Sequence, residues 1–296
     1  MPAGILFGLA AALSWGAADF LARYSSRSIG AYRTLFFMQA AGFLAASIYL
    51  VCTQESAVAL ARAAAAHAGL AVFLGASSGL SMLAFYSALE KGTLSLVAPI
   101  ASSYPALTVL LAYASGERLT RLRLAGVALT LCGVVLASMG QAPAADAAHG
   151  APGARPRRDP GVWLAIAASA GFGVTYWALG FRAIPAWGGI GTVWIQRFST
   201  LVWLGAAALP MRRSLALPVG SGWWLVGIVG VLDAGGFLLS NLGFQREQVG
   251  VVTVLGSLFG AVTLILAFAI LGERLARRQW VGVGMIFAGI LLINSI

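Results

Sequence analysis

The sequence predicts an all-α integral membrane protein whose ten transmembrane helices form two inverted five-helix repeats. Three observations support this fold class: charge is scarce, long apolar runs follow one another, and the two halves of the chain resemble each other. Only 9% of the 296 residues are charged and 60% are hydrophobic, with a mean hydropathy of +0.89. Soluble globular domains carry roughly 25% charged residues, so the composition excludes that class.

Ten apolar runs, bounded by charged residues, Pro or Gly, have the length needed to cross a bilayer. A transmembrane helix needs ~20 apolar residues to cross ~30 Å of hydrocarbon. Lipid cannot satisfy backbone polar groups, and the runs lack the short alternating pattern of a membrane β-barrel. We therefore expect helices at about residues 4–24, 32–52, 68–89, 93–114, 122–140, 161–181, 189–210, 222–244, 249–271 and 279–295.

One segment, residues 141–160, separates the first five runs from the last five. It is rich in Ala, Pro and Gly and contains three arginines, a composition typical of a flexible linker. The prediction is a first five-helix repeat in residues 1–140 and a second in residues 161–296. We interpret Asp146 and His149 as solvated linker residues rather than metal ligands.

The two halves share sequence at a nearly constant offset. Gly-Glu-Arg-Leu at 116–119 recurs at 272–275, and nine of the twenty-one positions 116–136 are identical at this shift of 156. A shift of 157 aligns Gly16 with Gly173 and Gln39 with Gln196. These matches predict a duplication. Because each half has an odd number of helices, the second half enters the membrane from the opposite side, which makes the repeats inverted.

The net charge of +10 does not indicate a nucleic-acid partner. Arginines cluster at the ends of apolar runs, as at Arg212 and Arg213, which predicts contact with anionic membrane lipids. Loops after the odd-numbered runs hold twelve basic residues and the other loops six, a count that favours both termini outside. Cys52 and Cys132 lie far apart, and we expect free thiols.

Three charged residues fall inside predicted spans: Asp19, Asp233 and Arg197. A charge at the bilayer centre costs ~3 kcal/mol on insertion scales, so such residues usually face a partner or a cavity. We expect an ion pair between Asp233 and Arg197, with a structural role and a substrate or proton role both open. For Asp19, a cavity position and an interfacial position beside Arg23 and Arg27 are both open.

The fourth and ninth spans carry helix-breaking residues at similar depths. Pro99 and Pro105 lie in the fourth span, and Gly256 and Gly260 lie in the ninth. Paired interruptions in two repeats point to a central binding site, because the freed backbone groups can coordinate a ligand. A simple kink is the alternative interpretation.

Polar and aromatic residues near these positions complete the predicted site. Asp19 aligns with Tyr176 at the shift of 157, so both halves present polar or aromatic character at this depth. The residues predicted to bind substrate or couple transport are Asp233, Arg197, Asp19, Gln39, Gln196, Trp15, Tyr86, Tyr104, Tyr176, Trp177 and Asn241. Small polar residues, including Ser78, have two open interpretations: they pack helices together, or they contact the substrate.

The duplicated Gly-Glu-Arg-Leu, between the fourth and fifth spans of each half, resembles EamA-type transporters of the drug/metabolite transporter superfamily. Ser14-Trp15-Gly16 and Glu90-Lys91-Gly92 extend the resemblance, which covers nearly the whole chain. It implies a secondary carrier of amino acids, metabolites, nucleotide precursors or drugs, often an exporter. We expect a small-molecule substrate such as an amino acid or amphipathic metabolite, with Asp233 and Arg197 binding it or carrying a coupling proton. The resemblance also implies cytoplasmic termini, and we follow it over the basic-residue count.

Motifs for other functions are absent from the sequence. The single lysine, Lys91, is not part of a phosphate-binding loop, and no His-Glu-x-x-His occurs. An ATP-driven pump and a metalloprotease are therefore excluded, and no cofactor or metal is expected. A channel and an intramembrane lipid-modifying enzyme stay as alternatives. Eighteen Arg against one Lys is typical of a GC-rich bacterial genome, so we expect a multi-pass protein of the bacterial inner membrane.

Overall fold

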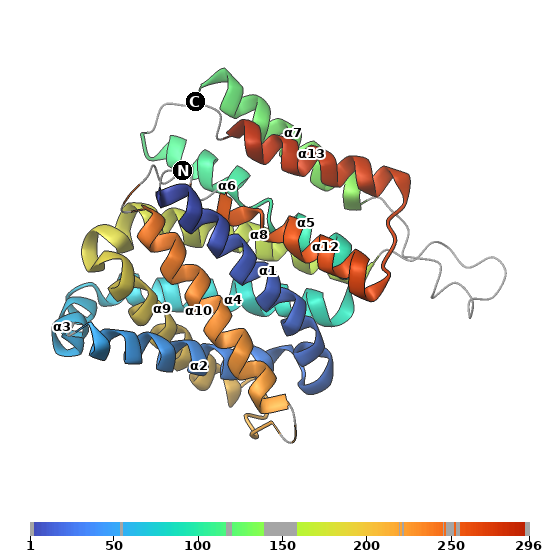
Figure 1. The fold of residues 1–296 in the computed structure, drawn as a ribbon. Coiled ribbons are helices and arrows are strands. Elements are labelled where there is room, and N and C mark those ends of the chain that lie inside the picture. The colour runs from blue at the N-terminus through green and yellow to red at the C-terminus, as the bar shows by residue number, and fades with distance from the viewer. Residues whose placement is uncertain are drawn as a thin grey trace.

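A computed structural model describes residues 3–53, 56–116, 120–138, 159–218, 222–244 and 255–293, together with residues 220, 246 and 252. These residues form helices and connecting turns (Figure 1). The helices of the first half are α1 (Ala3–Ile29), α2 (Ala31–Cys52), α3 (Ala57–Ala66), α4 (Ala68–Lys91), α5 (Leu94–Ala101), α6 (Pro105–Ala114) and α7 (Arg121–Ser138). Those of the second half are α8 (Pro160–Ala178), a π-helical turn (Leu179–Ala183), α9 (Ile184–Ala208), α10 (Gly222–Phe244), α12 (Phe259–Leu271) and α13 (Arg277–Ile293).

The helices match the predicted spans, which confirms the all-helical membrane fold. Five described stretches are long and apolar enough to cross a membrane: Ala31–Cys52, Ala68–Lys91, Leu94–Ala114, Pro160–Ala208 and Gly222–Gly243. The stretch Leu94–Ala114 joins α5 to α6, and the stretch Pro160–Ala208 contains two spans that meet near Gly188, where φ is 69°. Gly30, at the matching turn between α1 and α2, also has a positive φ of 88°.

The differences from the predicted spans are local. Helix α9 begins at Ile184, five residues before the expected start. Helix α1 continues to Ile29, five residues beyond the expected end. Helix α3 was not predicted; it is rich in Ala, the best helix former, and Ser56 caps its first turn by accepting a hydrogen bond from the Ala59 amide. The predicted linker lies outside the described residues, Asp146 and His149 included, except that Asp159 caps α8 and Pro160 begins it.

Each main contact between a helix of one half and a helix of the other has a counterpart, formed by the two equivalent helices. Helix α1 packs along α10, and the equivalent pair is α8 along α4. Helix α2 packs on α10, and the equivalent pair is α9 on α4. Helices α7 and α13, which are equivalent to each other, lie side by side at one edge of the bundle (Figure 1). This pattern is what two inverted repeats related by a pseudo-two-fold axis produce.

The contact between α7 and α13 depends on glycines that the duplication aligns. A Cβ added to Gly289 would lie 2.6 Å from the Thr130 amide nitrogen and 2.7 Å from the Gly126 carbonyl oxygen. A Cβ added to Gly133 would lie 2.7 Å from the Gly282 carbonyl oxygen. Small residues let membrane helices approach closely, so the shift of 156 identified residues that hold the two halves together.

The predicted interruptions are present at equivalent places. Between α5 and α6, residues 102–104 form a turn, in which the Ser103 amide donates to the Ile100 carbonyl at 3.2 Å. Before α12, the Leu258 amide donates to the Leu255 carbonyl in the same way, also at 3.2 Å. The two turns lie close together, because a Cβ on Gly260 would meet the side chain of Ser102.

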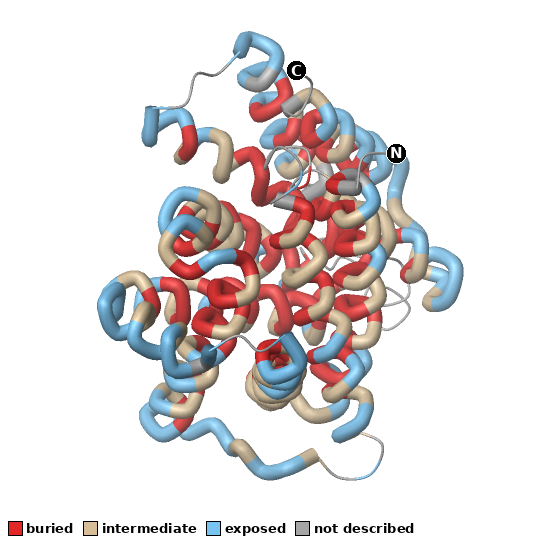
Figure 2. Tube along the Cα trace, turned by 60° about the vertical axis from the view of Figure 1, so that its left-hand side comes forward, coloured by how far each residue is buried: buried red, intermediate tan, exposed pale blue. Residues whose placement is uncertain are grey.

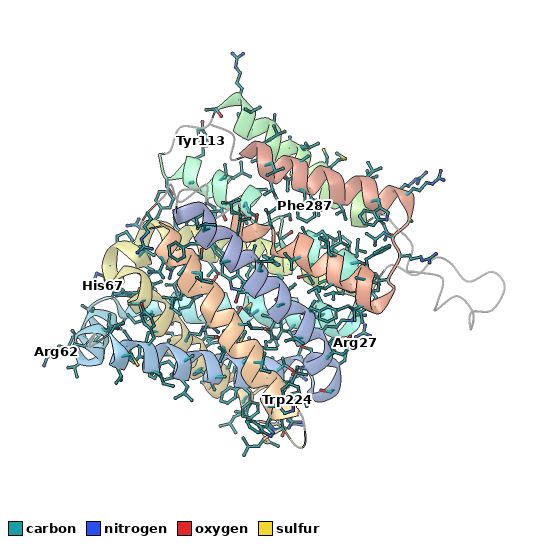
Figure 3. All side chains as sticks on the ribbon, in the orientation of Figure 1. Arg27, Arg62, His67, Tyr113, Trp224 and Phe287 are labelled. Atoms are coloured by element: carbon teal, nitrogen blue, oxygen red, sulfur yellow. The ribbon has the colours of Figure 1, made fainter. Side chains whose placement is uncertain are left out.

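Burial is concentrated in the middle of the bundle (Figure 2). Every residue of α5 is buried, whereas large apolar side chains such as Leu13, Val72 and Trp163 are exposed on the outside. Side chains fill the spaces between helices, and Arg62 on α3 extends from the periphery (Figure 3). An apolar exterior around a packed interior is the arrangement expected in lipid.

Replacing Gly289 by Leu is expected to lower the thermal unfolding midpoint of the detergent-solubilised protein. The added side chain would overlap the backbone of α7, and overpacking of this kind costs ~1–3 kcal/mol. Gly284→Leu on the same helix is the matched control, because Gly284 is exposed and a Cβ there meets nothing within 4 Å. Equal midpoints for the two variants, measured by circular dichroism, would show that α7 and α13 do not pack as described.

Candidate functional site

A pocket lies at the centre of the bundle, between the two halves. The cavity that its walls leave is small, about 40 Å³. Its lining is mostly aromatic, with a few polar groups: Trp15, Asp19, Ser78, Met82, Phe85, Tyr104, Phe172, Thr175, Tyr176, Gln196, Asp233, Phe237 and Phe259. Such a lining is typical of a small-molecule site, in which a few placed polar groups orient an apolar ligand.

The pocket is built from equivalent positions of the two repeats. Trp15 and Phe172 are 157 residues apart, and Tyr104 and Phe259 are 155 apart. Hydrogen bonds repeat as well. Thr108 Oγ1 on α6 donates to the Gly173 carbonyl at 3.1 Å, and Thr263 Oγ1 on α12 donates to the Gly16 carbonyl at 3.3 Å.

This repetition places the two interrupted spans against the first helix of the opposite half. Tyr104 is the last residue of the first interruption and Phe259 directly follows the second. Both therefore line the pocket. The structure thus places both interruptions beside the central pocket; that this pocket is a binding site stays a prediction.

Arg197 and Asp233 form an ion pair between α9 and α10, as the sequence predicts. Their side chains are 3% and 5% exposed. Arg197 Nη2 donates to Asp233 Oδ2, and Nη1 donates to Gln39 Oε1 on α2 at 2.6 Å. The guanidinium carbon also lies 5.3 Å from the ring centre of Phe237, a distance suited to a cation–π contact. Arg197 on α9 therefore links its own helix to α2 and α10.

Small residues make room for this network. A Cβ on Gly42 would lie 2.9 Å from Arg197 Nη1, and one on Gly230 would lie 2.5 Å from the Met38 carbonyl oxygen. Helices α2 and α10 therefore approach closely beside the guanidinium. Gly75, 155 residues before Gly230, has the same role between α4 and α9, with a Cβ position 2.7 Å from the Ser199 carbonyl.

Asp19 differs from Asp233 in having no partner. Its side chain lines the pocket and the residue is 5% exposed. It makes no hydrogen bond or ion pair with any residue that the structure describes. Arg23 and Arg27, which the sequence offered as interfacial neighbours, bind elsewhere, and α1 continues ten residues past Asp19. The structure therefore favours the cavity position for Asp19 over the interfacial one.

Trp15 binds α1 to α10 at the pocket wall. Its indole nitrogen donates to the Asp233 carbonyl at 3.2 Å, and Ser14 Oγ donates to the Leu232 carbonyl at 2.6 Å. Gly236 is necessary for this approach, because a Cβ there would lie 2.5 Å from the indole nitrogen. The predicted Trp15 is thus both a lining residue and an interhelical anchor.

The remaining predicted residues divide between the pocket and other places. Tyr104, Tyr176 and Gln196 line it, and Gln196 Nε2 donates to Ser78 Oγ at 3.0 Å. Tyr86 is fully buried behind the lining, and its hydroxyl has no hydrogen-bond partner in the described chain.

Five of the predicted residues do not line the pocket: Arg197, Gln39, Tyr86, Trp177 and Asn241. Arg197 and Gln39 are bound to each other beside it, and the last two lie elsewhere. Trp177 donates to Ser115 Oγ at 2.8 Å on an exposed part of the bundle, and Asn241 donates to the Gly189 carbonyl at 2.7 Å beside a separate pocket.

Several lining residues were missed at the sequence level. They are mainly apolar and look like ordinary core residues: Met82, Phe85, Phe172, Thr175, Phe237 and Phe259. The duplication contains a usable signal for two of them. Phe172 aligns with Trp15, and Phe259 aligns with Tyr104, at shifts of 157 and 155.

A polar cluster joins the two halves near the start of α5. Arg23, one helical turn beyond Asp19, pairs with Glu273 at 2.6 Å. Glu273 Oε2 also accepts from the Ser95 amide at 2.8 Å, and Asp159 Oδ2 accepts from the Thr93 amide at 2.9 Å. The two carboxylates thereby satisfy free N–H groups at the start of α5.

The cluster also gives a role to one copy of the repeated motif. Glu273 belongs to the second copy of Gly-Glu-Arg-Leu, and the helix that it caps is α5 of the other half. Glu117, in the other copy, lies outside the described residues.

Comparison with known proteins agrees with the fold. A protein-family description, the EamA-like transporter family, matches residues 2–139 and again residues 159–295. The probable 4-amino-4-deoxy-L-arabinose-phosphoundecaprenol flippase subunit ArnE of Pseudomonas fluorescens is 33% identical over 102 residues, which make up 33% of this chain and 81% of that protein. A protein of known crystal structure has a TM-score of 0.69 at 18% identity, covering 99% of this chain and 97% of the other; this likeness concerns the fold.

Breaking the Arg197–Asp233 pair from one side is expected to destabilise the protein more than removing both charges. A single Arg197→Met or Asp233→Leu change leaves a buried charge without its partner, which costs ~3–5 kcal/mol, whereas replacing a whole buried pair is often nearly neutral. Thermal unfolding of both single variants and of the double variant in detergent measures the coupling. Additive losses in the double variant would contradict the described pairing.

Proposed function

The chain belongs to the EamA-like transporter family, and from this premise we propose that it is a secondary active transporter that works by alternating access. The family makes it a multi-pass membrane transporter and not an enzyme. The moving units in this proposal are the two five-helix halves, residues 1–140 and 161–296. The substrate is a small metabolite that binds in the central pocket.

The observation that carries the proposal is the composition of the pocket wall. Equivalent positions from both repeats contribute to it, as with Trp15 and Phe172. Two inverted units around one site can rock against each other and expose that site to each side in turn. A pocket whose lining carries few charges supports a carrier over a channel, which would need a continuous polar path.

The polar cluster at the start of α5 supplies a closed end for such a cycle. Arg23 and Glu273 come from opposite halves, so a rocking motion would have to separate them. Their burial is partial, with side chains 9% and 12% exposed. Opening this end would therefore expose them to water, which repays part of the cost of breaking the ion pair.

Direction and cellular setting are finer parts of the proposal. We infer export across a bacterial inner membrane with both termini in the cytoplasm, and cysteine labelling at the two termini checks the orientation. A lipid-linked amino sugar, of the kind named for the relative ArnE, belongs among the candidate substrates together with amino acids and amphipathic metabolites. A proton is the proposed coupling ion.

Ser78→Phe is expected to abolish transport by filling the pocket. Counterflow of a metabolite and drug panel in proteoliposomes, with and without a pH gradient, first identifies a saturable substrate. Leu80→Phe is the matched control on the same helix, because Leu80 is 56% exposed to the surroundings of the bundle and lies outside the pocket. Unsaturable flux, or equal transport by both variants, would contradict a carrier that uses this pocket.

Glu273→Gln is expected to increase the opening of the end that the polar cluster closes. The change removes an ion pair and weakens two hydrogen bonds to α5. A loss of ~1.5 kcal/mol or more raises the open population ~tenfold. The measurement is the rate at which a thiol reagent labels Ser95→Cys, a fully buried position, after the exposed Cys52 and Cys132 are replaced by Ser.

Ser28→Cys, exposed at the same end, serves as the control for reagent access. Its labelling rate should not change with Glu273→Gln. An unchanged rate at Ser95→Cys would mean that the cluster does not hold this end closed.

A further inference from the structure

The central pocket holds one more acid than it has basic groups to balance. Asp233 is paired with Arg197, while Asp19 lines the same pocket without an ion pair or hydrogen bond in the described chain. No basic side chain belongs to the described lining. An unbalanced carboxylate in a buried site is costly. A cation supplied from outside the chain would remove that cost.

The nearby arginines are not available to neutralise Asp19. Arg23 pairs with Glu273 and also donates to the Gly92 carbonyl at 3.2 Å. Arg27 Nη2 donates to the same carbonyl at 3.2 Å. Both point toward the polar cluster at the start of α5, which leaves the Asp19 carboxylate facing the pocket.

Aromatic rings surround the pocket in a closed sequence of contacts. Successive ring centres are 4.5 to 6.5 Å apart. The ring members, in order, are Trp15, Tyr176, Tyr104, Phe172, Phe85 and Phe259. Aromatic faces attract cations, most strongly when water is excluded. Aromatic walls with one free carboxylate therefore match a ligand with a positive charge and an apolar body.

We propose that the pocket binds a monovalent organic cation with an aromatic or otherwise apolar body, and that Asp19 is its counter-ion. The proposal rests on the proposed transport function and names its substrate class. A zwitterionic amino acid would also need a free basic group for its carboxylate. Arg197 does not supply one, because Nη1 is bound to Gln39 and Nη2 to Asp233. An amine without a carboxylate is thus favoured over an amino acid.

Calorimetric titration of the full-length protein in detergent tests this assignment. The probes are benzyltrimethylammonium, the anion phenylacetate, the zwitterion phenylalanine and neutral benzyl alcohol. We expect the cation to bind with the highest affinity. Asp19→Asn should weaken its binding ~tenfold or more, the equivalent of ~1.4 kcal/mol, and should remove the preference for the cation over benzyl alcohol. Asp19→Glu should keep that preference.

Glu90→Gln is the matched control, because Glu90 lies outside the pocket and accepts from the Ala31 amide at 3.1 Å. It should bind the cation as the wild type does. If Asp19→Asn does not fold, the order of affinities among the four probes on the wild-type protein decides. Equal cation binding by Asp19→Asn, or preference of the wild type for any of the other three probes, would overturn the proposal.

The outcome is separable from that of the transport function. Saturable counterflow that is confined to anions, zwitterions or neutral compounds would overturn the cation site and leave the carrier in place. Absence of saturable counterflow for every compound would overturn the carrier, whichever probe binds.

Discussion

Lipid cannot solvate charge, so a charged group inside the bundle is costly unless it has a partner within the protein, and such pairs join helices of this bundle to one another. Five acids belong to the described part of the chain. Four of them are held: Asp233 by Arg197, Glu273 by Arg23, and Asp159 and Glu90 by backbone amides. These contacts connect helices from opposite halves or adjoining spans. Asp19 is the exception, and its freedom distinguishes the pocket from the rest of the interior.

Most of the fold was predictable because its causes are local in the sequence. Apolar runs of membrane length define the helices, and the shift of 156 identified Gly133 and Gly289, where α7 and α13 meet. Pro105 marked the interruption of the fourth span. Helix α3 was missed because its Ala-rich segment is short and lies between spans. A search for apolar runs of membrane length does not detect such a helix.

The site was predictable only in part, because the pairing of charged groups and the direction in which each side chain points are properties of the folded chain. The sequence indicates that Asp19, Asp233 and Arg197 are costly inside a membrane and predicts the Asp233–Arg197 pair, but it leaves open whether Asp19 faces a cavity or the membrane interface. Neighbours on a helix point ~100° apart, so Tyr176 enters the pocket while Trp177 binds Ser115. Apolar lining residues carry no chemical signal of their own.

The pocket positions that correspond between the halves are not chemically identical. In the alignment of the two repeats, Asp19 corresponds to Tyr176, and Asp233 corresponds to Ser78. Two identical half-length chains assembled around a two-fold axis would present every charged group twice. Their shared cavity could hold only an even number of carboxylates and an even number of guanidinium groups. Joining the halves in one chain lifts this parity restriction, because each copy can mutate alone. The fused chain can therefore have a cavity with a net charge of a single unit, whereas a symmetric dimer of half-length chains cannot.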